Sequence, residues 1–201
     1  MTTTEALEYL DLLLDKADQP YFIDSEKVKF VNLSITEFIN KYYDKVDFNS
    51  ESRTALNGLY RTVTQDASDI SSWTTPNRYD ILDNAFMYPS AVKVNGAEAE
   101  FKGYKEYVED LSTNDPFNKS DLDNPQYTIS NFGVICNPEP VTFFRIVYLY
   151  RPTITEAFDN GKIQENYQIE ILNIASRKMF ANIESASYEM QSIETERGTN
   201  Q

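Results

Sequence analysis

The 201-residue chain contains no histidine and a single cysteine, Cys136. The absence of histidine excludes Ser-His-Asp and Cys-His catalysis and removes the commonest metal ligand. A single cysteine excludes an intrachain disulfide framework and a cysteine-rich zinc site. Because Cys136 ends the apolar run FGVIC, we expect a small buried side chain there and not a nucleophile, which needs an exposed, electropositive setting. We therefore expect no catalytic residue.

Glycine-rich loops and clustered positive charge are also missing. The six glycines are isolated, so no phosphate-binding loop is present, and the 18 Lys and Arg residues are dispersed among 32 Asp and Glu residues. Binding a nucleic-acid backbone requires clustered basic side chains. A protein with a net charge of -14 would instead repel DNA, so that DNA could move past its surface without binding. No apolar run approaches the ~20 residues of a membrane span, and the acidic N-terminus is unlike a signal peptide. We expect a protein made in a reducing cytoplasm, without membrane contact.

The many carboxylates leave two possibilities to weigh. Asp121 and Asp123, with Asp115 nearby, could offer oxygen ligands to calcium, but the segment DLDN lacks the glycine and distal glutamate of an EF-hand loop. We interpret these residues as turn and cap chemistry. An acid-dependent hydrolase would need two opposed carboxylates in a pocket, one with a raised pKa, and no motif points to such a pair. We expect no metal site and no cofactor.

The apolar spacing predicts helices near the N-terminus. The first begins after Thr3 or Thr4 and runs to about Ala17. After Pro20, Asp24 or Ser25 caps a second helix. Its apolar stripe is Val28, Val31, Ile35, Phe38, Ile39, Tyr42 and Val46.

A third helix is expected to start at Asn49 or Ser50. Its apolar face comprises Leu56, Leu59, Tyr60 and Val63. Three helices joined by short capped turns would form a small antiparallel helical unit.

The pattern changes to strands in the middle of the chain. Residues 92–101 are a hairpin candidate with Asn95-Gly96 at the turn, and a short helix follows over 104–111. Residues 127–136 predict a strand, and 141–150 predict a central strand that is covered on both faces. A final helix over 163–193 would be ~45 Å long, and either returns onto the N-terminal helices or reaches a neighbouring subunit.

We therefore predict the α+β class: an N-terminal helical bundle, a β-rich middle as an antiparallel sheet or small sandwich, and a long C-terminal helix. We expect one compact domain overall. Its parts are a helical unit (1–65), a loop (66–76), a β-rich part (77–155), a C-terminal helix packed on the N-terminal helices (156–193) and a flexible tail (194–201).

Several motifs in order resemble the ring or adaptor proteins in the neck of tailed bacteriophages, especially crAss-like podophages. The segments are LDKADQPYF, IDSEKVKFVNLSITEFINKYY, ESRTALNGL, NDPFNKS, YLYRP and ENYQIEILNIASRKMF. Within them the matching positions are Asn32-Leu33, Phe38-Ile39, Tyr42-Tyr43, Asp115, Pro116, Phe117, Lys119, Tyr150, Arg151 and Pro152. The resemblance covers roughly residues 5–190, and the chain departs from the pattern between Tyr79 and Pro89.

This resemblance implies a non-enzymatic virion structural protein. It would be a head-to-tail connector subunit, assembled in the host cytoplasm into a ring, with twelve copies expected, that joins the portal to the tail. Its partners would be itself, the portal and other neck or tail proteins, while DNA passes the channel without specific binding. The candidate interface residues are Val31, Ile35, Phe38, Tyr42, Phe117, Tyr150 and Arg151. The alternative is a cytosolic oligomeric interaction or regulatory protein without catalytic activity.

Overall fold

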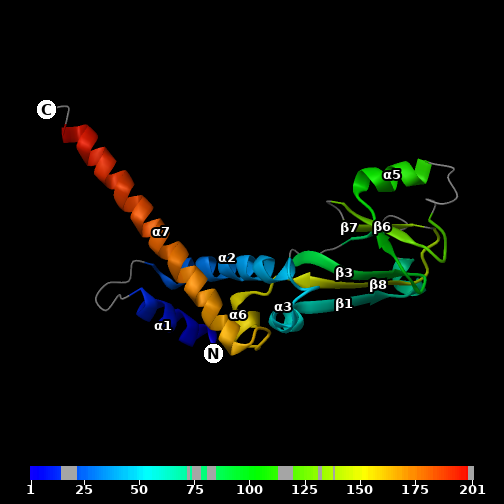
Figure 1. Ribbon diagram of the computed structural model, residues 1–201, viewed down its shortest axis with the longest axis horizontal. Helices are drawn as coiled ribbons and strands as arrows, with labels where there is room; N and C mark the ends of the chain where they lie inside the picture. Colours follow the sequence, from blue (N-terminus) through cyan, green and yellow to red (C-terminus); the bar gives the residue numbers. More distant parts are fainter. Residues whose placement is uncertain are drawn as a thin grey trace. The chain divides into compact units, whose positions relative to one another are not determined.

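The computed structural model describes residues 1–14, 22–71, 73, 78–80, 85–112, 120–130, 133–137 and 139–198, with the backbone alone for 184–198. The chain divides into two compact units (Figure 1). The helical unit comprises Met1–Leu59 and Arg151–Gln201, and the β unit comprises Tyr60–Tyr150. Helices from both ends of the chain thus flank a β-rich middle in the sequence, and the predicted α+β class is confirmed.

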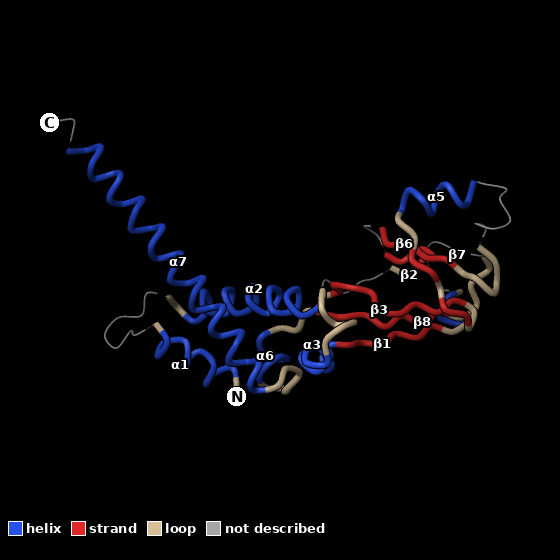
Figure 2. The backbone as a smooth tube through the Cα atoms, viewed as in Figure 1, coloured by secondary structure: helices blue, strands red, loops and turns tan. Residues whose placement is uncertain are grey.

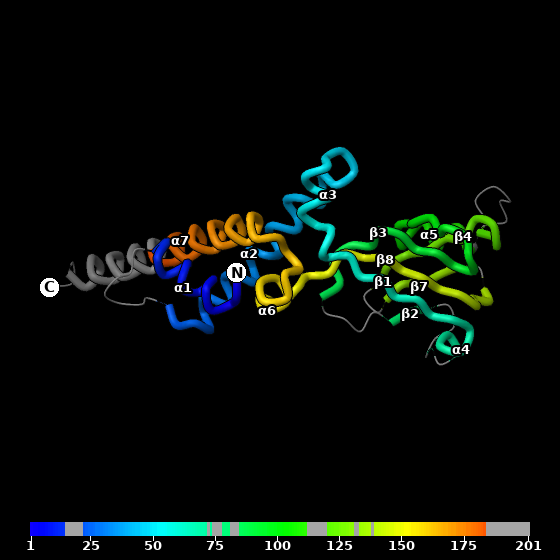
Figure 3. Tube along the Cα trace, turned by 90° about the horizontal axis from the view of Figure 1, so that it is seen from below, coloured from blue at the N-terminus to red at the C-terminus, as the bar shows by residue number. Residues whose placement is uncertain are grey.

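The helical unit is built around the second helix. Its elements are α1 (Thr3–Leu13), α2 (Asp24–Tyr43), α3 (Ser50–Leu56), the 3-10 helix η1 (Asn57–Leu59), α6 (Ile154–Phe158) and α7 (Glu165–Gly198). Helices α1 and α7 both lie against α2 (Figures 1 and 3). Side chains at the centre of both helices have no exposed surface. They are Val31, Ile35, Phe38 and Ile39 of α2 and Ile171, Leu172, Ala175 and Met179 of α7. Burying these side chains stabilises the unit, because each removes its apolar surface from water.

The helix starts differ slightly from the predicted ones. Thr2, one residue earlier than expected, caps α1, because its hydroxyl accepts the Glu5 N–H and the Glu5 carboxylate accepts the Thr2 N–H at 2.7 Å. Helix α2 starts at Asp24, after Ile23 and not after a capping side chain. Asn49 caps α3 as predicted, accepting the Glu51 N–H at 2.8 Å.

The predicted length of the third helix is wrong. Helix α3 ends at Leu56, and after η1 the chain enters a strand that contains Tyr60 and Val63. Gly58 explains part of this turn, because a Cβ at that position would overlap the backbone carbonyl of Lys162. Glycine at this position therefore permits the close approach of the two backbones.

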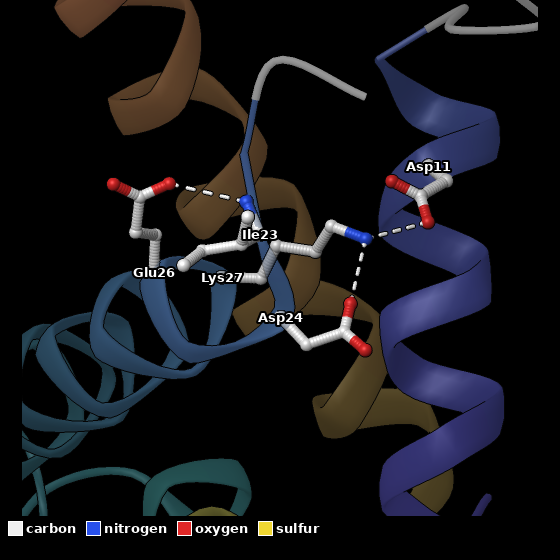
Figure 4. A network of polar contacts seen from close by, with 5 residues as sticks. All are labelled: Asp11, Ile23, Asp24, Glu26 and Lys27. Atoms are coloured by element: carbon white, nitrogen blue, oxygen red, sulfur yellow. Dashed lines mark hydrogen bonds and ion pairs between the residues drawn. The ribbon is translucent and has the colours of Figure 1, made fainter. Parts of the chain in front are cut away.

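Polar contacts tie α1 to the rest of the helical unit. The backbone N–H and hydroxyl of Thr3 donate to the two carboxylate oxygens of Asp159, at 2.5 and 2.8 Å. Near the other end of α1, the buried Lys27 ammonium donates to Asp11 at 2.7 Å and to Asp24 at 3.0 Å (Figure 4). Burial lowers the pKa of Lys27, but the two carboxylates outweigh it and the net shift is upward.

The β unit contains two four-stranded sheets. Its elements are β1 (Tyr60–Gln65), α4 (Ala67–Ile70), β2 (Arg78–Tyr79), β3 (Phe86–Val94), β4 (Ala97–Glu98), β5 (Glu100–Phe101), α5 (Tyr104–Ser112), β6 (Gln126–Ser130), β7 (Gly133–Asn137) and β8 (Phe144–Tyr150). The strand orders are β1-β8-β3-β4 and β2-β7-β6-β5, and only the β5–β6 pair is parallel among the described strands. The sheets form two layers, with α5 lying on β6 (Figure 2).

The core of the β unit lies between the two sheets. Phe144, Ile146 and Tyr148 of β8 are buried there with Val134 and Cys136 of β7. The sequence predicts cover on both faces of β8, but Arg145 is exposed and Val147 is half-buried. The second face of this sheet is therefore open at these positions, and the charge of Arg145 reaches solvent.

Two further elements differ from the prediction. The expected strand over 127–136 is the antiparallel pair β6–β7, in which Tyr127 lies opposite Cys136. The expected loop over 66–76 contains α4, because the Asp66 carboxylate accepts the N–H groups of Ser68 and Asp69.

The hairpin at Asn95-Gly96 is confirmed. Both residues have positive φ angles, 52° and 93°, as a tight turn between β3 and β4 requires. Asn95 also makes long-range contacts, because its side-chain oxygen accepts the Thr142 N–H at 2.7 Å and its amide donates to the Pro140 carbonyl at 3.0 Å. The turn residue thus fixes the approach to β8 as well as the hairpin.

Candidate interaction surfaces

Cys136 and Asp121, which the sequence offered as a possible nucleophile and a possible calcium ligand, have structural roles. Cys136 is fully buried, as expected, and burial raises the pKa of its thiol to about 12. The Asp121 carboxylate accepts the N–H groups of Asp123 at 2.9 Å and Asn124 at 2.7 Å, which is the turn chemistry that the sequence indicated. Asp115 lies outside the described residues. No cluster of three or more potential metal ligands occurs in the described part of the chain.

Four of the predicted interface residues belong to the core of the helical unit. Val31, Ile35 and Phe38 have no exposed surface, and Tyr42 is 8% exposed. The rings of Phe38 and Tyr42 contact each other and the ring of Tyr167 on α7, with centroid distances of 4.8 to 5.8 Å. These side chains hold α7 on α2, so a contact with a neighbouring subunit would have to use other residues.

A carboxylate completes this α2–α7 contact. The hydroxyl of Tyr42 donates to Glu170 Oε2 at 2.8 Å, and the ammonium of Lys41 donates to Glu170 Oε1 at 2.5 Å. Burial and the neighbouring Glu170 charge raise the pKa of Tyr42, because both disfavour the phenolate. The return of the last helix onto the N-terminal helices is thus fixed by polar as well as apolar contacts.

The three other predicted interface residues lie elsewhere. Tyr150 is buried in the β unit, where the Arg61 guanidinium lies 3.5 Å from the centroid of its ring. Arg151 is exposed. Phe117 lies outside the described residues.

Phe48 is the most exposed large apolar side chain among the described residues of the helical unit, with 92% of its surface exposed. It lies in the Phe48 turn (residues 44–49), between α2 and α3. Arg53 fixes this turn, because its guanidinium donates to the carbonyls of Val46 at 2.9 Å and Asp47 at 2.7 Å. The Phe48 N–H also donates to Lys45 O at 3.1 Å. The aromatic ring is therefore presented to solvent from an ordered turn.

A second surface feature of the helical unit is the α2–α7 pocket (Glu37, Ile174, Arg177, Lys178 and Ala181), an open pocket of about 210 Å³. Two of its lining residues are apolar and two are basic. The Lys178 ammonium pairs with the Glu37 carboxylate at 2.5 Å, and the Arg177 guanidinium donates to the Asn173 carbonyl at 3.2 Å. The pocket is thus lined by two apolar and three charged residues, and its rim has a net positive charge.

The helix α5 presents an apolar face in the β unit. The spacing of Tyr104, Val108 and Leu111 places them on one side of this helix, and they are 61%, 46% and 54% exposed. Tyr107, on another side, is buried instead, and its hydroxyl has no hydrogen-bond partner within the described part of the chain. The face that the periodicity identified is therefore the one left in water.

The sequence analysis identified neither Phe48 nor the α2–α7 pocket, for different reasons. Phe48 stands among polar residues in DKVDFNSES and lies off every apolar stripe, and this isolation is the signal that could have marked it. The pocket combines Glu37 with residues more than 130 positions later, so no local pattern contains it.

No protein-family model matches the chain, and no curated protein matches it. Among the described residues, no helix combines the length and the apolar character needed to cross a membrane.

Proposed function

We propose that the protein is a virion structural subunit of a tailed bacteriophage, a neck ring protein that joins the portal to the tail. The observation that carries this proposal is the exposure of large apolar side chains on both units. Phe48 in the helical unit and Tyr104 and Leu111 in the β unit are each more than half exposed. Tyr104 and Leu111 share one face of α5 with Val108, and an apolar face left in water is typical of a surface that a partner covers.

The kind of assembly follows from the sequence resemblance to phage ring proteins. That resemblance includes the segment IDSEKVKFVNLSITEFINKYY, which contains α2, and YLYRP, which includes the end of β8. In this proposal the helical unit contacts neighbouring copies, and the β unit contacts the portal or other neck and tail proteins. A contact surface requires no reactive group, which agrees with a chain that lacks histidine.

The net charge of -14 supports a role in lining the DNA channel. An acidic wall repels phosphates, so the genome would move past it without binding. The purified chain should therefore leave the mobility of duplex DNA unchanged in a gel-shift assay at physiological salt. A basic channel lining in the assembled ring would contradict this part of the proposal.

Electron microscopy of purified phage particles tests the proposal directly. We expect the chain as a closed ring between the capsid portal and the tail, and we expect its peptides in mass spectra of the same particles. If the chain is absent from particles but abundant in infected-cell cytosol, the alternative of a cytosolic oligomeric interaction protein is favoured.

A further inference from the structure

We infer that Phe48 of one copy inserts into the α2–α7 pocket of the next copy, and that this head-to-tail contact builds the ring. This inference rests on the proposed ring assembly and names the contact that would carry it. Both features belong to the helical unit, so the pairing depends only on the geometry of that unit.

Size supports this pairing. A dry cavity of about 150 Å³ holds a benzene ring, and the α2–α7 pocket offers about 210 Å³. Ile174 and Ala181 provide apolar surface for the ring. A phenylalanine side chain that is 92% exposed would lose part of its contact with water on entering this open pocket.

Charge also favours a second copy as the occupant. The Phe48 turn carries the exposed carboxylates of Asp44 and Asp47 and the exposed ammonium of Lys45, so its net charge is negative. The pocket carries Arg177 and Lys178, of which Lys178 is already paired with Glu37. In a chain with a net charge of -14, a contact between an acidic turn and a basic rim avoids the repulsion that two arbitrary surfaces would meet.

The two features are separate patches of the helical unit, as a heterologous contact requires. Glu37 lies six residues before the end of α2, which corresponds to ~9 Å along the helix, and Phe48 lies beyond that end. One copy can therefore offer its Phe48 to one neighbour while its pocket receives the Phe48 of another. Repeated contacts of this kind produce a ring when the rotation between copies closes.

The test uses the purified full-length chain in sedimentation velocity and native mass spectrometry. Phe48→Ala removes the inserted ring, and Ala181→Trp fills the pocket. Leu12→Ala is the matched control, because it truncates another exposed apolar residue of the helical unit, 76% exposed on α1. All three positions are exposed, so circular dichroism should show unchanged folding.

We expect Phe48→Ala to raise the Kd of self-association at least ~30-fold, as the loss of a buried aromatic anchor does. Ala181→Trp should have a similar effect, and Leu12→Ala should have none. A mixture of Phe48→Ala and Ala181→Trp should form dimers and nothing larger. The Phe48→Ala variant keeps an open pocket, and the Ala181→Trp variant keeps the Phe48 side chain that can enter it.

Three results would overturn the inference. The wild-type chain could stay monomeric, the Phe48→Ala variant could self-associate with the same Kd as the wild type, or the mixture of the two variants could remain monomeric. If Phe48→Ala still forms rings, this contact is wrong while the proposed function stands. If the wild-type chain forms rings through Phe48 but is absent from particles, the contact stands while the proposed function fails.

Discussion

The network around Lys27 predicts that removing the cation costs less stability than removing its partners. The Lys27 side chain is 5% exposed, whereas those of Asp11 and Asp24 are 39% and 75% exposed. In Lys27→Met, both carboxylates can regain water and a similar side chain fills the space. The free energy of unfolding should therefore change by no more than about 1 kcal/mol.

Removing the carboxylates leaves a buried charge without a partner. Asp11→Ala alone breaks one charged hydrogen bond and should cost about 1–3 kcal/mol. The double variant Asp11→Ala/Asp24→Ala should cost about 3–5 kcal/mol, because Lys27 then stays buried and unpaired. Adding Lys27→Met to the double variant should recover most of that loss.

Urea unfolding followed by circular dichroism at the helical signal measures these differences. Asp24→Ala alone removes one bond to Lys27 and also a favourable charge at the start of α2, the latter worth about 0.3–1 kcal/mol. Two outcomes would contradict this reasoning: Lys27→Met lowers the free energy of unfolding as much as the double carboxylate variant does, or it fails to restore the stability of that variant. In either case the burial of an unpaired Lys27 charge does not explain the loss of stability. The ion pairs themselves would then stabilise the fold.

The same network gives a pH dependence with a defined sign. Because folding raises the pKa of Lys27, its contribution to stability is complete below the ordinary value of 10.5 and is lost as the pH rises above it. Tyr42 shifts in the same direction, so the comparison is between wild type and Lys27→Met. The wild type should lose more stability than the variant on alkaline titration, and equal slopes would contradict the assignment.

Three further predictions concern other parts of the chain. Ile35→Asp should unfold the helical unit, because it buries an unpaired charge at a site without exposed surface, and loss of the helical dichroism would confirm this. Asn95→Ala should destabilise the β unit by about 1–3 kcal/mol in urea unfolding, since it removes the contacts to 140–143 and strains a positive-φ turn. Cys136 should resist alkylation at pH 8 until the protein is unfolded, because the thiolate is disfavoured and the sulfur is buried; rapid labelling of the native chain would refute this.

The helices could be predicted largely from local patterns. The stripe of α2 recurs at three- and four-residue steps and its central members are buried, as a one-sided packing face requires. The sequence offered two covers for that stripe, the C-terminal helix of the same chain and a neighbouring subunit. Helix α7 covers it, so residues that looked like an interface between subunits are instead a contact within one chain.

The strands were harder to predict because their pairing is non-local. Tyr60 and Val63 continue the spacing of a helical face, yet they pair with Leu149 and Ile146 of β8. A partner more than 80 residues away decides the structure, and a local window does not contain it. The turn at Asn95-Gly96 was predictable because its chemistry is local, whereas the bonds of Asn95 to residues 140–143 were not.

The pairing of β1 with β8 has a consequence for how this protein can be altered and diversified. Tyr60 and Leu149 are opposed in an antiparallel ladder, and such partners have Cα atoms about 4.5–5.5 Å apart. The entire β unit therefore begins and ends at nearly the same point, next to Leu59 and Arg151. A short glycine-containing linker between these two residues could replace the β unit, so that the helical unit can be produced alone or joined to a different module. Related sequences could exchange this middle segment while retaining the helices on which the proposed ring depends.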